Sequence, residues 1–131
     1  MVFDEMNRKI KKILNKKNKS KIICLTAYSK NIAAEVDKYA DITLVGDSLG
    51  SVLYNYNSTR DVTLTEMINH SKSVRLAVKK SLMVVDMPYN TYATNTSALK
   101  NAKKIIKYTK CDAVKLEGGK KIIKQIKFLI K

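Results

Sequence analysis

The sequence lacks long apolar runs and has little cysteine and histidine. No uncharged apolar stretch approaches the roughly 18–20 residues that a membrane span needs, which argues against a membrane helix. The two cysteines, Cys24 and Cys111, lie in apolar segments and indicate free thiols, acting as small hydrophobic residues, in a reducing compartment, hence the cytoplasm. The single histidine, His70, has no second imidazole to share a zinc ion with, and we expect it to be structural.

Acidic residues are also few, with 11 Asp and Glu against 26 Lys and Arg, and the formal net charge is +15. Only three of the basic residues are arginine, the side chain that usually reads phosphates and base edges. We therefore favour lysines on solvated helix faces and expect no nucleic-acid or membrane partner. The alternative is a lysine-rich module that binds nucleic acid or an anionic membrane through residues 6–21 and 100–131.

The sequence does contain enough apolar material for one modest domain. Hydrophobic residues make up 45% of the chain, which allows a buried core. Residues 1–20 are expected to form an amphipathic helix, over residues 4–17, followed by a polar linker. Apolar side chains recur there at helical spacing, at Phe3, Met6, Ile10, Ile13 and Leu14. Residues 21–131 form the second unit.

Strands and helices alternate four times through the second unit. The predicted strands are residues 21–26, 42–46, 82–85 and 113–116, with helices between them and a last helix from about residue 120. The expected N-caps are Ser29, Thr63 in a capping box with Glu66, and Thr96 or Ser97. The segment YNYNST is predicted to be a loop. This order indicates βαβ units and a parallel sheet, whose strands are apolar on both faces because helices cover them.

Three of the predicted strands end at an acidic residue. Asp47, Asp86 and Glu117 follow the second, third and fourth strands. Because the carboxyl ends of parallel strands share one face of a sheet or barrel, we expect these side chains to converge. Three carboxylates repel one another unless a cation lies among them, and Mg²⁺ suits such oxygen ligands. Lys115 and Ser48 could bind an anionic substrate group beside them. Alternatively, each acid is only a strand-end cap or a solvated loop residue.

Four motifs along the chain resemble one enzyme family. They are LVGDSLG, ST..VT..EM..H, VVDMPY and VKLEGG, and the match runs from about residue 21 to residue 119. Together they are similar to ketopantoate hydroxymethyltransferase, also called 3-methyl-2-oxobutanoate hydroxymethyltransferase. The resemblance implies an α/β fold, the first half of a (β/α)₈ TIM barrel of the phosphoenolpyruvate/pyruvate-binding type. It also implies an N-terminal helix that covers the bottom of the barrel.

The resemblance further implies a reaction and the residues that serve it. The family transfers a hydroxymethyl group from 5,10-methylenetetrahydrofolate to 3-methyl-2-oxobutanoate, which forms 2-dehydropantoate in pantothenate and coenzyme A biosynthesis. Its Mg²⁺ positions match Asp47, Asp86 and Glu117. Its keto-acid positions match Asp47, Ser48, Asp86 and Lys115. A large homo-oligomer is also implied.

The chain departs from the family pattern chiefly in its length. A (β/α)₈ barrel takes about 250 residues, and this chain supplies four βα units. The general-base glutamate and much of the folate site are therefore expected beyond Lys131, and the 131 residues alone are expected to be inactive. Smaller departures are Tyr89, where the family usually has phenylalanine, and Asn55, where glycine is common. A Mg²⁺-dependent keto-acid lyase or mutase of the same barrel group remains a second hypothesis for the reaction.

Overall fold

The computed structural model describes residues 2–131 of the chain, and the side chain of Phe3 in the predicted apolar stripe lies outside the described residues. Helices and strands alternate in the order α1 (Val2–Lys16), β1 (Cys24–Thr26), α2 (Lys30–Tyr39), β2 (Ile42–Val45), α3 (Leu49–Tyr54), α4 (Leu64–Arg75), β3 (Leu82–Asp86), α5 (Asn95–Thr109), β4 (Ala113–Lys115) and α6 (Ile123–Leu129). Two 3₁₀ turns, η1 (Thr59–Asp61) and η2 (Gly119–Ile122), precede α4 and α6. The predicted alternation of strands and helices is confirmed.

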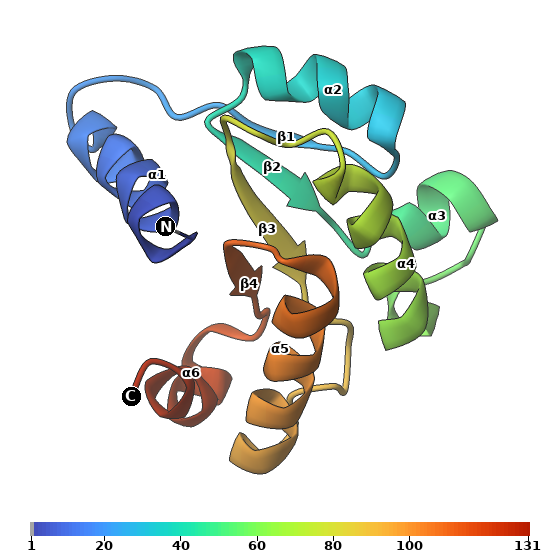
Figure 1. The fold of residues 1–131 in the computed structure, drawn as a ribbon. Helices are drawn as coiled ribbons and strands as arrows, with labels where there is room; N and C mark the ends of the chain where they lie inside the picture. Colours follow the sequence, from blue (N-terminus) through green and yellow to red (C-terminus); the bar gives the residue numbers. More distant parts are fainter. Residues whose placement is uncertain (1) are drawn as a thin grey trace.

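The four strands form one parallel sheet in the order β1-β2-β3-β4 (Figure 1). The register places Thr26 beside Leu44, and it places Asp86 of β3 beside Lys115 of β4. Sequential strands are neighbours throughout, as in the successive βα units of a barrel. The predicted α/β fold with parallel pairing is therefore confirmed, with four strands in the described residues.

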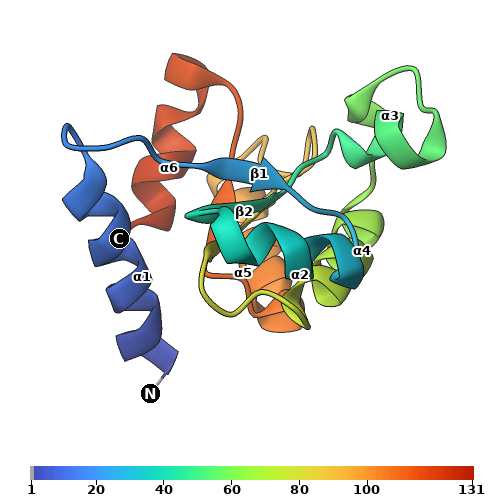
Figure 2. The ribbon, with the colours of Figure 1, turned by 90° about the horizontal axis from the view of Figure 1, so that it is seen from above.

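Helices α2, α4 and α5 lie together on one side of the sheet (Figures 1 and 2). The side chains of Thr43, Val45, Met83 and Val85 point to that side and are fully buried. On the opposite side Leu44 and Val84 are only half-buried. The edge strand β1 is exposed along its whole length, and Cys24 with it. The expectation of helix cover on both faces is therefore wrong at this edge. Both cysteines are free thiols, as predicted; Cys24 is exposed and Cys111 is buried.

Helix α1 packs against the amino-terminal end of the sheet through ion pairs. Lys16 Nζ lies 2.7 Å from the buried carboxylate of Asp41, directly before β2. Lys9 Nζ lies 3.4 Å from Asp112, directly before β4. Asp41 also accepts the backbone N–H of Ile23 at 3.0 Å. These contacts support the expected position of the N-terminal helix across the bottom of the fold.

The predicted N-cap residues are right at two helices and wrong at a third. Ser29 precedes α2 as expected, although its side chain makes no capping hydrogen bond. Thr63 and Glu66 form the expected capping box at the start of α4. Helix α5 is capped by Thr94, whose hydroxyl accepts the N–H of Ser97 at 3.1 Å, so the prediction of Thr96 or Ser97 is wrong by two or three residues. Ser97 serves instead as the partner of Thr94, because its own hydroxyl accepts the Thr94 N–H at 3.0 Å.

Several element boundaries also differ from the prediction. The first strand is shorter than residues 21–26, and α3 was not predicted at all. The last helix is preceded by η2 and ends at Leu129. None of these differences moves the residues that follow the carboxyl ends of the strands.

A buried carboxylate fixes the loop before β3. Asp37 of α2 accepts the backbone N–H groups of Lys79 at 2.8 Å, of Lys80 at 3.0 Å and of Ser81 at 2.8 Å, and the Ser81 hydroxyl at 2.7 Å. Burial raises the pKa of Asp37, but the hydrogen bonds from Ser81 and its neighbours outweigh burial and hold the pKa below its usual value. The anion thereby sets where β3 begins.

Candidate active site at the carboxyl ends of the strands

The centre of the candidate site is an acid and a base on adjacent strands. Asp86 is the last residue of β3 and Lys115 is the last residue of β4, and the sheet register pairs them. The Lys115 Nζ atom lies 2.9 Å from Asp86 Oδ1. Asp86 is only 4% exposed, and within the chain its Oδ1 atom is paired with the Lys115 ammonium. The centre of the site is therefore a buried carboxylate held by a partly exposed cation.

Asp47 and Ser48 reach the same place from the end of β2. The backbone N–H of Asp47 donates to Asp86 Oδ2 at 3.2 Å. The Ser48 hydroxyl shares a 2.7 Å hydrogen bond with the Tyr28 hydroxyl. A Cβ atom on Gly46 would lie 2.9 Å from Ser48 Oγ and 3.6 Å from Asp86 Oδ2, so glycine allows this close approach. Four of the five predicted site residues thus gather within one loop-and-strand cluster.

The charges of the cluster perturb one another. Burial raises the pKa of Asp47, and the nearby carboxylates of Asp86 and Glu117 raise it further, against the opposing effect of Lys115. Burial lowers the pKa of Lys115, but its hydrogen bond to Asp86 and the surrounding acids outweigh burial and raise that pKa. Lys115 therefore stays protonated. The carboxylates around it outnumber it, and such an excess of negative charge favours the binding of a cation.

A cavity of about 510 Å³ opens beside this cluster. Its lining residues are Asp47, Thr59, Arg60, Tyr89, Tyr92, Glu117, Gly118 and Lys121. Glu117 is exposed, and its backbone is held by Tyr92, whose hydroxyl donates to the Glu117 carbonyl at 3.0 Å. The cavity therefore connects Asp47 to Glu117 across the ends of the strands.

The carboxylates of the site are oxygen donors of the kind that Mg²⁺ prefers. Among the residues that the structure describes, no three His, Cys, Asp or Glu side chains lie close enough to one another to hold a metal ion. Asp47 and Asp86 do lie together, and the buried carboxylate of Asp86, whose Oδ1 atom is paired with the Lys115 ammonium at 2.9 Å, supplies oxygen ligands. Mg²⁺ commonly takes one or two carboxylates and leaves its other positions to water and substrate. The residues present therefore fit Mg²⁺, whereas the three-carboxylate set that includes Glu117 stays a prediction.

One residue of the site, Tyr28, was missed by sequence reasoning. Tyr28, in the loop after β1, contacts Ser48 through its hydroxyl, and its carbonyl oxygen lies 2.7 Å from His70 Nδ1. The other ring nitrogen of His70 lies 2.7 Å from the Tyr54 hydroxyl. His70 thus braces the loop that carries Tyr28, which agrees with the structural role predicted for it. No local signal could reveal Tyr28, because Ser48 is 20 residues away.

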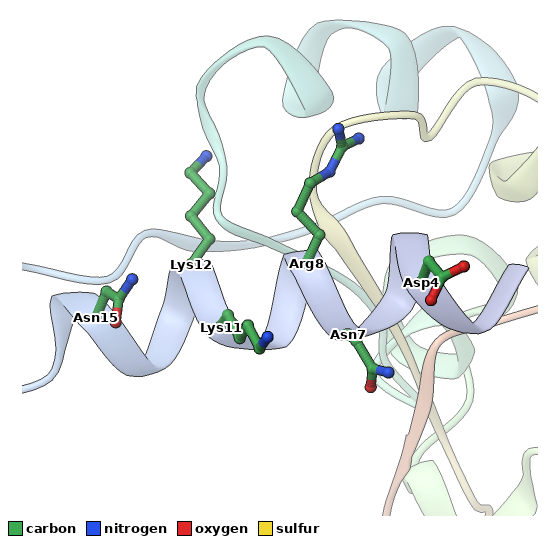
Figure 3. A pocket seen from close by; sticks show the side chains of 6 residues that line it. All are labelled: Asp4, Asn7, Arg8, Lys11, Lys12 and Asn15. Atoms are coloured by element: carbon green, nitrogen blue, oxygen red, sulfur yellow. The ribbon is translucent and has the colours of Figure 1, made fainter. Parts of the chain in front are cut away.

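A second hollow, of about 490 Å³, runs along α1 and is not part of this site. All six side chains that line it come from α1, and Arg8 and Lys12 point to the same side of the helix (Figure 3). The Lys12 Nζ atom lies 3.7 Å from Asp41, so its charge is partly paired inside the chain. Lys9, Lys12 and Lys16 therefore attach α1 to the sheet, which favours the structural interpretation of this basic segment.

Comparison with known proteins agrees with this geometry. The family model described as ketopantoate hydroxymethyltransferase matches residues 7–131. The chain belongs to this family. All five predicted site residues lie within the match. The predicted family resemblance and the partial TIM-barrel fold are thereby confirmed.

Curated relatives carry the same family name. A 3-methyl-2-oxobutanoate hydroxymethyltransferase of Pelagibacter ubique (strain HTCC1062) is 68% identical over 126 residues, which make up 96% of this chain and 49% of that protein. One of Anaplasma marginale (strain St. Maries) is 50% identical over 115 residues, or 88% of this chain and 42% of that protein. The chain spans about half the length of the curated relatives it matches. No helix among the described residues has the length and apolar character to cross a membrane.

Proposed function

We propose that this chain supplies the metal-binding and keto-acid-binding part of a 3-methyl-2-oxobutanoate hydroxymethyltransferase. The reaction transfers a hydroxymethyl group from 5,10-methylenetetrahydrofolate to 3-methyl-2-oxobutanoate and yields 2-dehydropantoate for pantothenate biosynthesis. The observation that carries the proposal is the Asp86–Lys115 pair beside Asp47, at the carboxyl ends of parallel strands, in a chain 68% identical to a protein of that name.

The keto acid is an anion, and the site offers it a cation and a hydroxyl. The Lys115 ammonium is nearly half exposed on one side while its other side faces Asp86, so it can bind the substrate carboxylate. Ser48 is oriented by Tyr28 and can donate its hydroxyl hydrogen to the same carboxylate. The two groups would hold the keto acid with its ketone toward Asp47 and Asp86, which orients it for reaction.

Asp47 and Asp86 are proposed to hold Mg²⁺, with Glu117 as the third acid at the site. When bound, Mg²⁺ acts as a Lewis acid that polarises the ketone and favours loss of the C3 proton. Asp86 is buried, so its carboxylate is shielded from bulk water. The general base is proposed to be a glutamate of the other half of the barrel, outside these 131 residues.

We further propose a homo-oligomer in the cytoplasm, with no nucleic-acid partner. The last of these proposals is supported by ion pairs inside the chain, in which Lys9 contacts Asp112 and both Lys12 and Lys16 contact Asp41. A nucleic-acid module would need those charges for phosphates, and its affinity would fall steeply with salt.

The experiment is a thermal melt of the chain with Mg²⁺ and 3-methyl-2-oxobutanoate. Wild-type protein should melt at higher temperature when both are present, because a ligand that binds only the folded state stabilises it. Asp47→Asn and Asp86→Asn should each abolish the shift. Glu35→Gln is the matched control, since Glu35 is exposed and pairs only with Lys38 among the described contacts. The absence of a shift in the wild type, or an equal shift in Asp86→Asn and Glu35→Gln, would count against the proposal.

A further inference from the structure

The hydrogen bond between Ser48 and Tyr28 has a direction that follows from the proposed role of Ser48. A serine hydroxyl carries one hydrogen and can also accept through its lone pairs. When Ser48 gives its hydrogen to a substrate carboxylate, the 2.7 Å hydrogen bond between the two hydroxyl oxygens is donated by Tyr28. Tyr28 therefore holds the Ser48 oxygen and leaves the Ser48 hydrogen free for the ligand.

The backbone of Tyr28 is held on two sides. Tyr28 lies in the loop between β1 and α2, and the N–H of the preceding residue, Ala27, donates to the Leu44 carbonyl of β2 at 3.0 Å. From α4, the Nδ1 atom of His70 lies 2.7 Å from the Tyr28 carbonyl oxygen. The sheet and α4 thus fix the point from which the Tyr28 side chain reaches Ser48.

The contacts of His70 determine which ring nitrogen carries its hydrogen. A carbonyl oxygen can only accept, so Nδ1 donates to the Tyr28 carbonyl. In a neutral imidazole the other nitrogen then accepts, and its partner is the Tyr54 hydroxyl at 2.7 Å. The two rings also meet edge to face, with their centres 5.7 Å apart. Both nitrogens of His70 are therefore paired, and the orientation of its ring is fixed.

The Tyr54 side chain is itself held by its neighbours. Its ring stacks on that of Tyr56, with the centres 5.4 Å apart and the planes at 25°. The Tyr56 hydroxyl donates to Glu66 Oε1 at 2.6 Å, and Glu66 belongs to the capping box at the start of α4. A series of contacts therefore leads from the start of α4 to His70.

We propose that His70 is a positioning residue for the keto acid. It holds the backbone of Tyr28, Tyr28 donates to the Ser48 oxygen, and Ser48 donates to the substrate carboxylate. A hydroxyl that is already oriented loses less freedom when it meets its ligand than a freely rotating one, and this preorganisation strengthens binding. His70 acts only through Tyr28. The inference rests on the proposed function, to which it adds a residue that supports substrate binding from outside the site.

The test is the affinity of the 131-residue chain for 3-methyl-2-oxobutanoate, measured by isothermal titration calorimetry with Mg²⁺ present. In His70→Asn the side-chain NH₂ group takes the place of Nδ1 and can donate to Tyr28, so the affinity should stay within about twofold of wild type. In His70→Gln the amide reaches the place of Nε2 instead, so the affinity should fall about fivefold, the size of one neutral hydrogen bond.

The matched control is Ser73→Ala, on the same helix as His70. The Ser73 hydroxyl accepts the backbone N–H of Lys30 at 3.0 Å, at the exposed start of α2. This N–H group can hydrogen-bond to water once the hydroxyl is removed, so Ser73→Ala should leave the affinity for the keto acid unchanged. Circular dichroism melts establish that each variant is folded.

Double-mutant cycles test whether His70 and Tyr28 act through Ser48. Tyr28→Phe should weaken keto-acid binding about fivefold in the presence of Ser48, and it should have no further effect in Ser48→Ala. His70→Gln should likewise have no further effect in Ser48→Ala. The affinity for Mg²⁺ alone should be the same in all these variants, because none of them removes a carboxylate.

Four results would overturn the inference while the proposed function stands. They are equal affinities of His70→Asn and His70→Gln, a loss in Ser73→Ala as large as that in His70→Gln, an undiminished effect of Tyr28→Phe in Ser48→Ala, and a hydrogen on Nε2 of the neutral ring. The last is read by nitrogen NMR, in which the single histidine gives one unambiguous set of signals. Absence of keto-acid binding in the wild type would instead reject the proposed function, and the role of His70 with it.

Discussion

The buried carboxylate of Asp37 gives the sharpest prediction about stability. Four donors converge on it, from Lys79, Lys80 and Ser81, at distances of 2.7 to 3.0 Å. Asp37→Asn keeps the shape of the side chain, removes its charge and turns an amide NH₂ group toward some of these donors. The substitution therefore tests the anion rather than the volume that it fills.

The loss of stability expected from Asp37→Asn depends on which of the donors can hydrogen-bond to water once the carboxylate is removed. Lys79 and Lys80 are exposed, so their N–H groups can hydrogen-bond to solvent, whereas Ser81 is 1% exposed and cannot. A hydrogen bond to a charged group contributes about 1.5–3 kcal/mol, and we expect Asp37→Asn to lower the free energy of unfolding by about 2–3 kcal/mol. For a domain of this size the melting temperature should fall by roughly 10 °C.

The direction in which the stability contributed by Asp37 changes with pH follows from its lowered pKa. A carboxyl group whose pKa is depressed in the folded state stabilises the fold above its unfolded pKa, and that stability is lost as pH falls through the folded pKa. The difference between wild type and Asp37→Asn, measured by urea unfolding, should be full at pH 7 and should shrink below about pH 4. Glu35→Gln, on the same helix, should change stability by less than about 0.5 kcal/mol. Equal effects of the two substitutions, or a difference that grows at low pH, would refute this reasoning.

Three further predictions concern the helix cap, the site and turnover. Thr94→Ala should cost about 1 kcal/mol in urea unfolding, whereas Thr96→Ala should cost little, because only Thr94 caps α5; the reverse order would contradict the cap assignment. Gly46→Ala should weaken 3-methyl-2-oxobutanoate binding in calorimetry while the protein stays folded, because the new Cβ lies 2.9 Å from Ser48 Oγ; unchanged affinity would exclude Ser48 from the site. The 131-residue chain should not catalyse deuterium exchange at C3 of the keto acid in NMR, and robust exchange would mean that these residues contain a general base.

The strand ends could be predicted because the relevant signals are local. Asp47 and Asp86 each close an apolar run, Lys115 lies in the last predicted strand, and parallel strands necessarily bring their carboxyl ends to one edge. The parallel topology therefore places these three residues close together, although they are far apart in sequence. The register pairs Asp86 with Lys115, and their side chains make a 2.9 Å contact. Glu117 lies two residues beyond β4 in an exposed loop, so its distance from the other acids was not fixed by the same argument.

The features that sequence reasoning missed depend on long-range or ambiguous signals. Asp37 finds its partners 42 to 44 residues later, and one acid within a helix carries no sign of them. Thr94, Thr96 and Ser97 are all acceptable N-caps, and only the extended backbone at Thr94, with φ of −122°, decides among them. Helix α3 has six residues and no side-chain cap, so its sequence resembled the loop that follows it.

A cation held by Asp47 and Asp86 is central to the proposed function, and calorimetric titration of Mg²⁺ into the chain with 3-methyl-2-oxobutanoate tests for it most directly. We expect Mg²⁺ to bind to wild type, the keto acid to strengthen this binding, and Asp86→Asn to remove it while Glu35→Gln leaves it intact. Keto-acid binding that is independent of Mg²⁺, or Mg²⁺ binding that survives Asp86→Asn, would contradict the proposed function.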